Sequence, residues 1–253
     1  MEDAVQSGNA RKLAELMKQD PGFNVNMRLD DDGWALLHFA CAENYRSVVI
    51  PLLLAHPDID VNVKGRYAQT PFYYACNGYT SCVHEMLKDS RVKVNETDDD
   101  GHTPLYLAAW SGRLETIKWW IVSGREMDLG TPGDVGKTDA IGVAKEWGHA
   151  KVVTLLERFK ENPGGTKHVM RVDLGWYGAL AAEIFALVVF VSDELLQIKD
   201  TMNTTPAARF FKIARSLPLE LQIVLCFRQV GSAKEIIPGK ESEVAFKELA
   251  RRI

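Results

Sequence analysis

The chain has 253 residues, of which 46% are hydrophobic and 25% are charged, and its formal net charge is −4. A chain of this length and composition folds into one or two packed domains, which excludes an intrinsically disordered polypeptide. The acidic balance gives no basis for binding nucleic acid, because that binding rests on an excess of basic side chains.

The first residues, MEDAVQSGNARKLAELM, begin with acids and contain no apolar stretch of the kind found in secretory signals. The four cysteines form neither a CxxC pair nor a zinc-ligand spacing with histidine; they are Cys41, Cys76, Cys82 and Cys226. We therefore expect free, buried thiols in a reducing compartment, the cytoplasm or, as the alternative, the nucleus. We predict no metal ion and no cofactor.

A pattern repeats through the first two thirds of the chain. Four blocks in register read GWALLHFACAENYRSVVIPLL, TPFYYACNGYTSCVHEML, GHTPLYLAAWSGRLETIKWW and GKTDAIGVAKEWGHAKVVTLL. Their leading positions are spaced by 35, 33 and 35 residues; they are Ala35, Thr70, Thr103 and Thr138. AVQSGNARKLAELM fits the same frame as an earlier half-unit. A period of this length indicates stacked helix–turn–helix units.

Each block carries residues that such a unit needs. Thr-Pro begins a helix, because the threonine hydroxyl can cap it and the fixed φ of proline suits the first helical position. Small residues such as Ala108 let the two helices of a unit approach closely. Gly112 supplies a left-handed turn between helices, and Asn44 is expected to take that conformation in the first full block. In the block that begins at Thr70, Gly78 lies one place early and Tyr79 occupies the usual glycine position.

These motifs resemble the ankyrin repeat, whose pattern is DxxGxTPLHxAAxxGHxxVVxxLLxxGADVN. The resemblance covers residues 1–160 and implies an all-α solenoid, with an N-terminal half repeat and four full repeats. It places His38 at the histidine of the TPLH motif, where the side chain bonds the backbone of a neighbouring loop. The tails NVN, DVN and KVN, which precede successive blocks, match the end of the pattern.

The run TDDDG, at residues 97–101, also looks like the start of a calcium loop. An EF-hand loop has glycine at position 6 and needs a bidentate glutamate at position 12. With Gly101 at position 6, position 12 is Leu107, which cannot bind calcium. We interpret the aspartates as turn formers, because Asx side chains before glycine favour turns.

Residues 130–140, GTPGDVGKTDA, similarly suggest the phosphate loop GxxxxGK[ST]. Thr131 stands where that motif needs its first glycine, and the flanking segments have the helical repeat period instead of strands. Gly136 is in register with Gly101, so we interpret the segment as another finger turn between repeats. GxSxG and HExxH are absent from the sequence, and we predict no catalytic residue.

After the repeats, residues 161–172 contain proline and glycine and predict a linker to a helical domain over residues 173–253. Residues 174–191, LGWYGALAAEIFALVVFV, are long enough for a membrane span, yet Glu183 lies near their centre, where a carboxylate is costly. We therefore favour a helix buried in a small bundle over a membrane-associated one.

Further helices are expected at residues 206–217, 218–231 and 241–253. The last repeat lacks the polar outer face of a terminal cap, and its uncovered apolar side chains are Val152, Leu155, Leu156 and Phe159. We predict that the long apolar helix packs on this end of the solenoid.

The ankyrin resemblance implies a non-catalytic scaffold that binds a partner protein through a concave surface of finger turns and first helices. By family position, the exposed residues of that surface are Asp31, Asp32, Trp34, Glu43, Arg66, Tyr67, Gln69, Asn77, Asp99, Asp100, His102, Trp110 and Ser111. The aromatic residues among them are candidate anchors, and the paired aspartates favour a basic segment in the partner. We expect a monomer that binds neither nucleic acid nor a membrane.

Two other functions remain as alternatives. The segment LPLELQIVLC at residues 217–226, followed by SEVAFKELARR, faintly resembles an F-box, which would make the chain a substrate-receptor adaptor of a ubiquitin ligase. A plain bundle helix also explains LPLEL, and we favour it. An enzyme with its active site in the C-terminal region would draw on Glu183, Asp193 and Glu194.

Overall fold

The computed structural model of the chain describes residues 1–134, 136–192, 210–211, 213–214, 217, 219–230 and 245. The chain divides into two compact units, which we call the repeat unit (Met1–Met170) and the C-terminal unit (Arg171–Ile253). Every regular element among the described residues is a helix, which confirms the all-α prediction.

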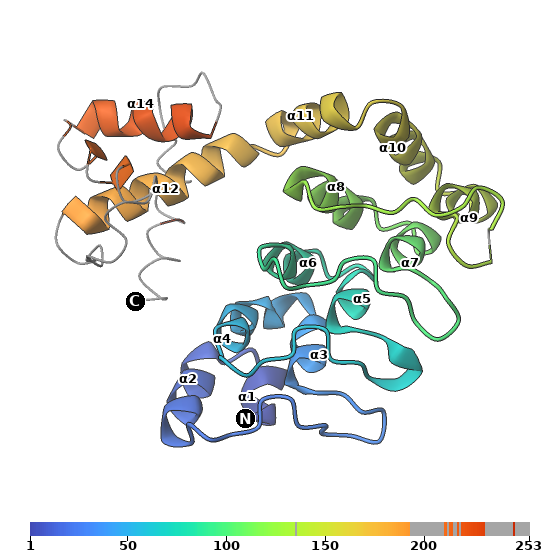
Figure 1. The fold of residues 1–253 in the computed structure, drawn as a ribbon, viewed down its shortest axis with the longest axis horizontal. Coiled ribbons are helices and arrows are strands. Elements are labelled where there is room, and N and C mark those ends of the chain that lie inside the picture. Colours follow the sequence, from blue (N-terminus) through green and yellow to red (C-terminus); the bar gives the residue numbers. More distant parts are fainter. Residues whose placement is uncertain are drawn as a thin grey trace. The chain divides into compact units, whose positions relative to one another are not determined.

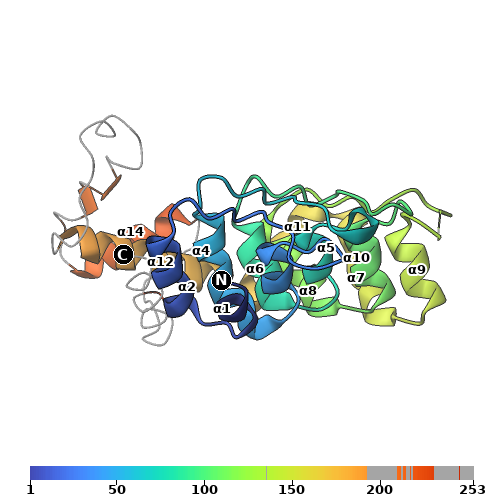
Figure 2. The same ribbon diagram turned by 90° about the horizontal axis from the view of Figure 1, so that it is seen from below.

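The helices of the repeat unit are α1 (Glu2–Gln6), α2 (Ala10–Gln19), α3 (Leu36–Cys41), α4 (Ile50–Leu54), α5 (Pro71–Ala75), α6 (Thr80–Leu87), α7 (Pro104–Trp110), α8 (Leu114–Ser123), α9 (Ala140–Glu146) and α10 (Ala150–Glu161). Two short 3-10 helices, η1 (Asn44–Val49) and η2 (Arg66–Ala68), accompany them. Helices α1, α3, α5, α7 and α9 form one layer and α2, α4, α6, α8 and α10 a second (Figure 1). Figure 2 shows the finger loops along one side of these layers.

The first helices begin where the Thr-Pro motifs place them. The hydroxyl oxygens of Thr70 and Thr103 accept hydrogen bonds from the backbone N–H groups three residues later, at 3.2 and 3.1 Å. The last repeat differs, because Asp139 caps α9 by accepting from the Gly142 N–H at 2.8 Å. Thr138, the position in register with the other threonines, bonds within the preceding loop instead. The helix therefore begins one residue later than the register predicts.

Glycines turn the chain between the paired helices, as expected. Gly112 has φ +64, and a Cβ there would lie 2.5 Å from Nδ1 of His149. Gly78 has φ +115, whereas Tyr79 is the cap of α6 with a negative φ. The turn after α5 is therefore one residue shorter than the turn after α7, and the glycine keeps its role. The prediction for Asn44 is wrong: it begins η1 without a positive φ, and its side-chain oxygen accepts from the Ser81 N–H.

Apolar side chains fill the space between the two helix layers. Phe72 and Trp120 are buried and meet edge to face, with ring centroids 5.1 Å apart. Ala108 and Ala109 are buried, as close helix packing requires. All four cysteines are free and buried, as predicted. Burial of this kind contributes about 1.5–3 kcal/mol for each large side chain.

A row of tail asparagines joins successive repeats. The Asn26 amide donates to the Asp58 carbonyl at 2.7 Å and accepts from the Asp60 N–H at 2.9 Å. Asn62 repeats this arrangement with the Arg91 carbonyl and the Lys93 N–H, at 3.0 and 2.8 Å. These contacts explain the recurring VN tails, since asparagine carries both a donor and an acceptor.

The segment predicted as a linker differs from that prediction, because it contains helix α11 (Pro163–Asp173). Proline at the first position suits a helix start, and the Asn162 side chain accepts from the Gly165 N–H at 2.9 Å. The buried Thr166 hydroxyl donates to the Arg158 carbonyl at 3.0 Å, and Met170 is also buried. Helix α11 thus packs beside the end of α10.

In the C-terminal unit, α12 (Trp176–Ser192) packs against α14 (Leu219–Gln229). Its core includes Ala182 and Phe185 from α12 and Cys226 and Phe227 from α14, so α12 has the buried face expected of a bundle helix. Within the described residues, no single helix combines the length and apolarity of a membrane span; α11 and α12 reach both only together, across a bend of 67°.

Several predictions for this region stay untested. Residues 206–217 and 241–253 lie mostly outside the described residues, as do Asp193 and Glu194 of the enzyme alternative. Glu183 is exposed on α12. The docking of the long helix on the last repeat likewise remains a prediction.

Candidate functional site

The thirteen residues assigned to the partner surface are all accessible, and we call them the finger–helix surface. Eight are exposed, namely Asp31, Asp32, Arg66, Tyr67, Asn77, Asp99, Asp100 and Trp110. The other five are partly exposed, namely Trp34, Glu43, Gln69, His102 and Ser111. Accessibility is necessary for binding, and the contacts below decide which of these side chains are free to bind.

The first aspartate of each DDD run shapes its finger turn. Asp30 accepts from the Trp34 N–H at 2.8 Å. Asp98 accepts from the His102 N–H and the Tyr73 hydroxyl, both at 2.8 Å. Burial alone would raise the pKa of Asp98, yet these hydrogen bonds hold it below its ordinary value. The first aspartates are therefore structural, as the turn interpretation predicts.

Three groups in this turn could together hold a metal ion, since ligand atoms of Asp98, Asp100 and His102 lie within 4.8 Å of one another. Both carboxylate oxygens of Asp98 already accept hydrogen bonds from protein donors. The His102 ring also bonds the Gly136 carbonyl of the next finger, at 3.0 Å. Turn formation accounts for this cluster without a bound ion.

Neighbouring fingers are bonded to one another in a row. The Arg66 guanidinium contacts the Asp32 carboxylate at 2.8 Å, and the Arg66 N–H donates to the Asp32 carbonyl at 2.7 Å. The Asp99 N–H donates to the Tyr67 carbonyl at 2.9 Å. Asp32 is thus partly neutralised, whereas no ion pair within the described residues involves Asp31, Asp99 or Asp100. Among the finger aspartates of this surface, the unpaired acidic charge therefore lies on those three side chains.

The finger at residues 65–69 has an unusual backbone. Tyr67 and Ala68 have φ +57 and +54, in the left-handed region that non-glycine residues rarely adopt. Ala68 occupies the place of Gly33 and Gly101 in the other fingers, where φ is +70 and +87. The Arg66 guanidinium lies over the exposed Tyr67 ring, 4.9 Å from its centroid. This finger therefore presents an aromatic ring on a strained turn.

The three candidate aromatic anchors are not equivalent. Trp34 packs against Phe39 and Tyr74, with centroids 5.1 and 4.7 Å away, so much of its ring is already covered. Trp110 is 41% exposed and meets Trp147 edge to face at 5.5 Å. Trp147 is 57% exposed and was not among the predicted surface residues. The strongest apolar anchor on this surface is thus a tryptophan pair.

The histidine of the TPLH motif has the structural role that the resemblance implies. His38 is buried; its Nδ1 accepts from the Ala35 N–H at 3.1 Å and its Nε2–H donates to the Gln69 carbonyl at 3.2 Å. Burial lowers the pKa of His38 to about 4, against the smaller opposing effect of the Gln69 bond. The ring is therefore neutral at pH 7 and joins two repeats.

Comparisons with known proteins agree with the repeat architecture. A family model described as ankyrin repeats (3 copies) matches residues 1–98 and 54–130. SMC5-SMC6 complex localization factor protein 1 of Homo sapiens is 41% identical over 93 residues, which are 36% of this chain and 9% of that protein. Rabankyrin-5 of Mus musculus is 32% identical over 101 residues, 40% of this chain and 8% of that protein. Alpha-latrotoxin-Lg1a of Latrodectus geometricus is 30% identical over 111 residues, with shares of 43% and 8%. The matched part thus spans less than a tenth of each relative.

Proposed function

We propose that this chain, which belongs to the ankyrin-repeat family, binds a partner protein through its finger–helix surface. The repeats and the ankyrin-containing relatives support a protein-interaction module in general. One of these relatives is named as a localization factor of the SMC5-SMC6 complex, which is a role of the same general kind.

The observation that carries this proposal is the exposed tryptophan pair, Trp110 and Trp147. Large aromatic side chains dominate binding energy at protein interfaces, because they bury much surface with few rotatable bonds. Beside the pair, the Ser111 hydroxyl donates to the Asn77 side-chain oxygen at 3.2 Å, which orders a polar border. An apolar anchor with a polar border is the arrangement found at the centre of protein interfaces.

The charge of the partner follows from the free carboxylates. Asp31, Asp99 and Asp100 are exposed without an ion pair among the described residues, whereas Asp32 is held by Arg66. A basic partner segment that crosses the fingers would gain attraction from these three groups. Because they are exposed, their main effect is on the association rate and its salt dependence. The partner is therefore proposed to present a basic segment next to an apolar group that meets the tryptophans.

Affinity purification with the full chain, followed by mass spectrometry, tests this proposal. The variant Trp110→Ala/Trp147→Ala is expected to lose the partner that the natural chain captures. Val48→Ala is the control, since Val48 is 51% exposed in η1, on the second helix layer. Capture of the same partner by the double variant would contradict the proposal.

The adaptor alternative remains a prediction. Helix α14 contains most of its first segment, and the second segment lies outside the described residues except for Ala245. Co-purification of a cullin-linker subunit would support it, and its absence from the purified complexes would remove it.

A further inference from the structure

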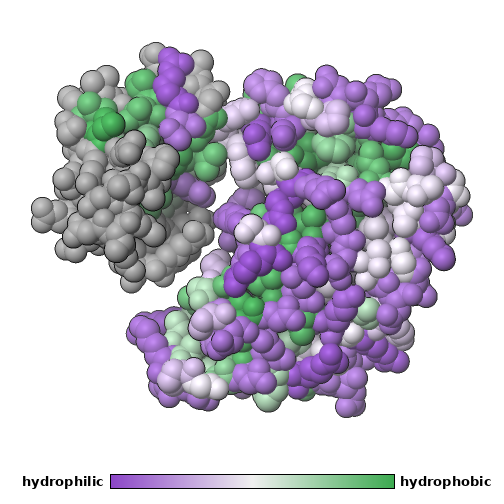
Figure 3. All heavy atoms as spheres, in the orientation of Figure 1, coloured by the Kyte–Doolittle hydropathy of each residue, from purple (hydrophilic) through white to green (hydrophobic). Residues whose placement is uncertain are grey.

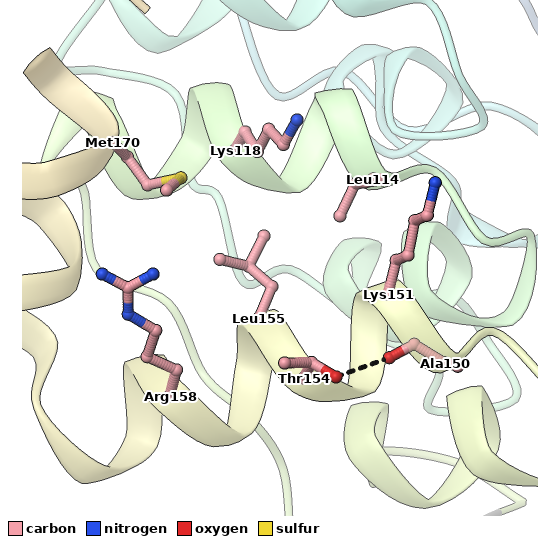
Figure 4. A pocket seen from close by; sticks show the side chains of 8 residues that line it. All are labelled: Leu114, Lys118, Ala150, Lys151, Thr154, Leu155, Arg158 and Met170. Carbon is pink, nitrogen blue, oxygen red and sulfur yellow. Dashed lines mark hydrogen bonds between the residues drawn. The ribbon is translucent and has the colours of Figure 1, made fainter. Parts of the chain in front are cut away.

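A groove of about 350 Å³ lies on the second helix layer (Figure 4). It is formed by α8, α10 and α11, and its lining residues are Leu114, Lys118, Ala150, Lys151, Thr154, Leu155, Arg158 and Met170. None of them belongs to the finger–helix surface. Figure 3 shows hydrophobic side chains between hydrophilic ones in the region of these three helices.

The groove has an apolar floor. Leu155 points from α10 toward α8, and Leu114 and Met170 flank it (Figure 4). The Thr154 hydroxyl donates to the Ala150 carbonyl at 2.9 Å, so it is satisfied within its own helix. A side chain that enters here meets mainly carbon and sulfur, and a volume of this size suits one or two large apolar side chains.

The charged groups that line the groove are all positive: Lys118, Lys151 and Arg158. Lys118 is paired with Glu115 at 2.6 Å. Within the described part of the chain, no carboxylate lies within ion-pair distance of Lys151 or Arg158. The composition of the first two thirds of the chain is acidic by contrast, since residues 1–172 carry 24 acidic and 20 basic side chains.

We infer that this groove binds an acidic peptide segment of another protein, through one or two large apolar side chains and flanking carboxylates. The apolar floor sets the position of the segment, and the two free cations select its charge. Nucleic acid would need a broad basic face, which the acidic balance of residues 1–172 does not offer.

The inference is independent of the proposed function, because the two sites share no residue. A chain that binds both ways could join a basic segment at the fingers to an acidic segment at the groove. Variants of one site should leave binding at the other unchanged, so the two proposals fail separately.

A fluorescein-labelled amphipathic peptide with leucines on one helical face and glutamates between them tests the inference, using fluorescence anisotropy with the full chain. Lys151→Glu/Arg158→Glu is expected to weaken binding by roughly tenfold or more, because attraction becomes repulsion. Lys160→Glu is the matched control, since Lys160 is exposed on α10 and does not line the groove. It should change the affinity by less than about twofold. A peptide with serines in place of leucines should not bind.

Thr154→Trp provides a second test that leaves the charge unchanged. Thr154 is exposed, and the indole would fill the groove and block the peptide. Circular dichroism and thermal unfolding verify that each variant is folded. Failure of the natural chain to bind the peptide, or equal binding by the groove variants, would overturn the inference. Loss of peptide binding in Trp110→Ala/Trp147→Ala alone would also overturn it, as would binding to anionic phospholipid vesicles in place of the peptide.

Discussion

The indole of Trp110, at the end of α7, meets the indole of Trp147, just after α9, edge to face at 5.5 Å. The two residues belong to successive repeats, and both are exposed. Stacking of the repeats thus assembles a two-ring apolar patch that neither repeat holds alone. The patch stands apart from the core, so its variants can separate binding from folding.

Substitution of Trp147 by alanine should change the free energy of unfolding by less than about 1 kcal/mol, because more than half of its surface is exposed. The affinity for a captured partner should fall by about 2 kcal/mol, as is typical of an aromatic hot spot. Urea unfolding and titration calorimetry give the two quantities. A large loss of stability with unchanged affinity would assign the residue to folding.

Acidification should destabilise the repeat unit through His38. Burial lowers the pKa of this ring from 6.5 to about 4, so the unfolded chain binds a proton in this window and the native chain does not. The contribution of His38 to the free energy of unfolding is therefore fully present above the pKa of the ring in the unfolded chain. It is lost as the pH falls toward the pKa of the ring in the folded chain. The loss should reach about 2 kcal/mol between about pH 8 and pH 5. Urea unfolding across this range measures it, and His38→Gln should flatten the dependence.

The inter-helix glycines offer a matched pair of substitutions. Gly112 and Gly148 have similar φ values, +64 and +73, but a Cβ at Gly148 would meet nothing within 4 Å. Gly148→Ala should therefore lower the free energy of unfolding by about 1–2 kcal/mol, which is the energy needed to hold an alanine in the left-handed conformation. Gly112→Ala should cost more, because the added methyl would displace the His149 ring, whose Nε2 bonds the Trp110 carbonyl. Equal losses in thermal unfolding would contradict this.

Substitution of Ala68 by glycine should change stability in the opposite direction, toward a more stable chain. With φ +54 in a place where other fingers have glycine, Ala68→Gly should relieve strain and stabilise the chain by up to about 1 kcal/mol. The greater freedom of glycine in the unfolded chain limits the gain. Thermal unfolding measures the change, and a lower melting temperature than that of the natural chain would show that the strain is already relieved by its surroundings.

Helix α11 should contribute to the stability of the repeats beside it. A chain that ends at Asn162 lacks the Thr166 bond to the Arg158 carbonyl and the buried Met170 side chain. We expect it to be less stable by about 2 kcal/mol or more than a chain that ends at Asp173. Denaturant unfolding of the two chains gives the comparison, and equal midpoints would make α11 dispensable.

The repeat register predicts the layers, the caps at Thr70 and Thr103 and the role of His38, because these depend on local motifs that recur. The repeat register does not predict which residue forms the turn or the cap in a repeat that is one residue shorter or longer than the others. Gly78 keeps its turn because the missing residue falls after α5, between Ala75 and Gly78, and Asp139 caps α9 in place of Thr138. In η1, the Asn44 side chain bonds the next repeat, a contact that no single repeat reveals.

The candidate surface likewise has features that the pattern of a single repeat predicts and features that depend on contacts between repeats. Family position predicts accessible places, but contacts between repeats decide which remain free. Arg66 neutralises Asp32, and Tyr74 covers Trp34, which the single-repeat pattern cannot show. Trp147 could have been found, because it stands immediately before the turn glycine, as Ser111 does.

The tail asparagines have a consequence for how the repeats respond to load and to local damage. Each side chain connects its repeat to the next through two hydrogen bonds, so Asn26 and Asn62 form a seam along the edge of the stack. A repeat that begins to open must break the two hydrogen bonds of its seam, both of which lie at the solvent-exposed edge of the stack. The seam therefore adds to the coupling between neighbouring repeats, which favours their opening together over their opening one at a time.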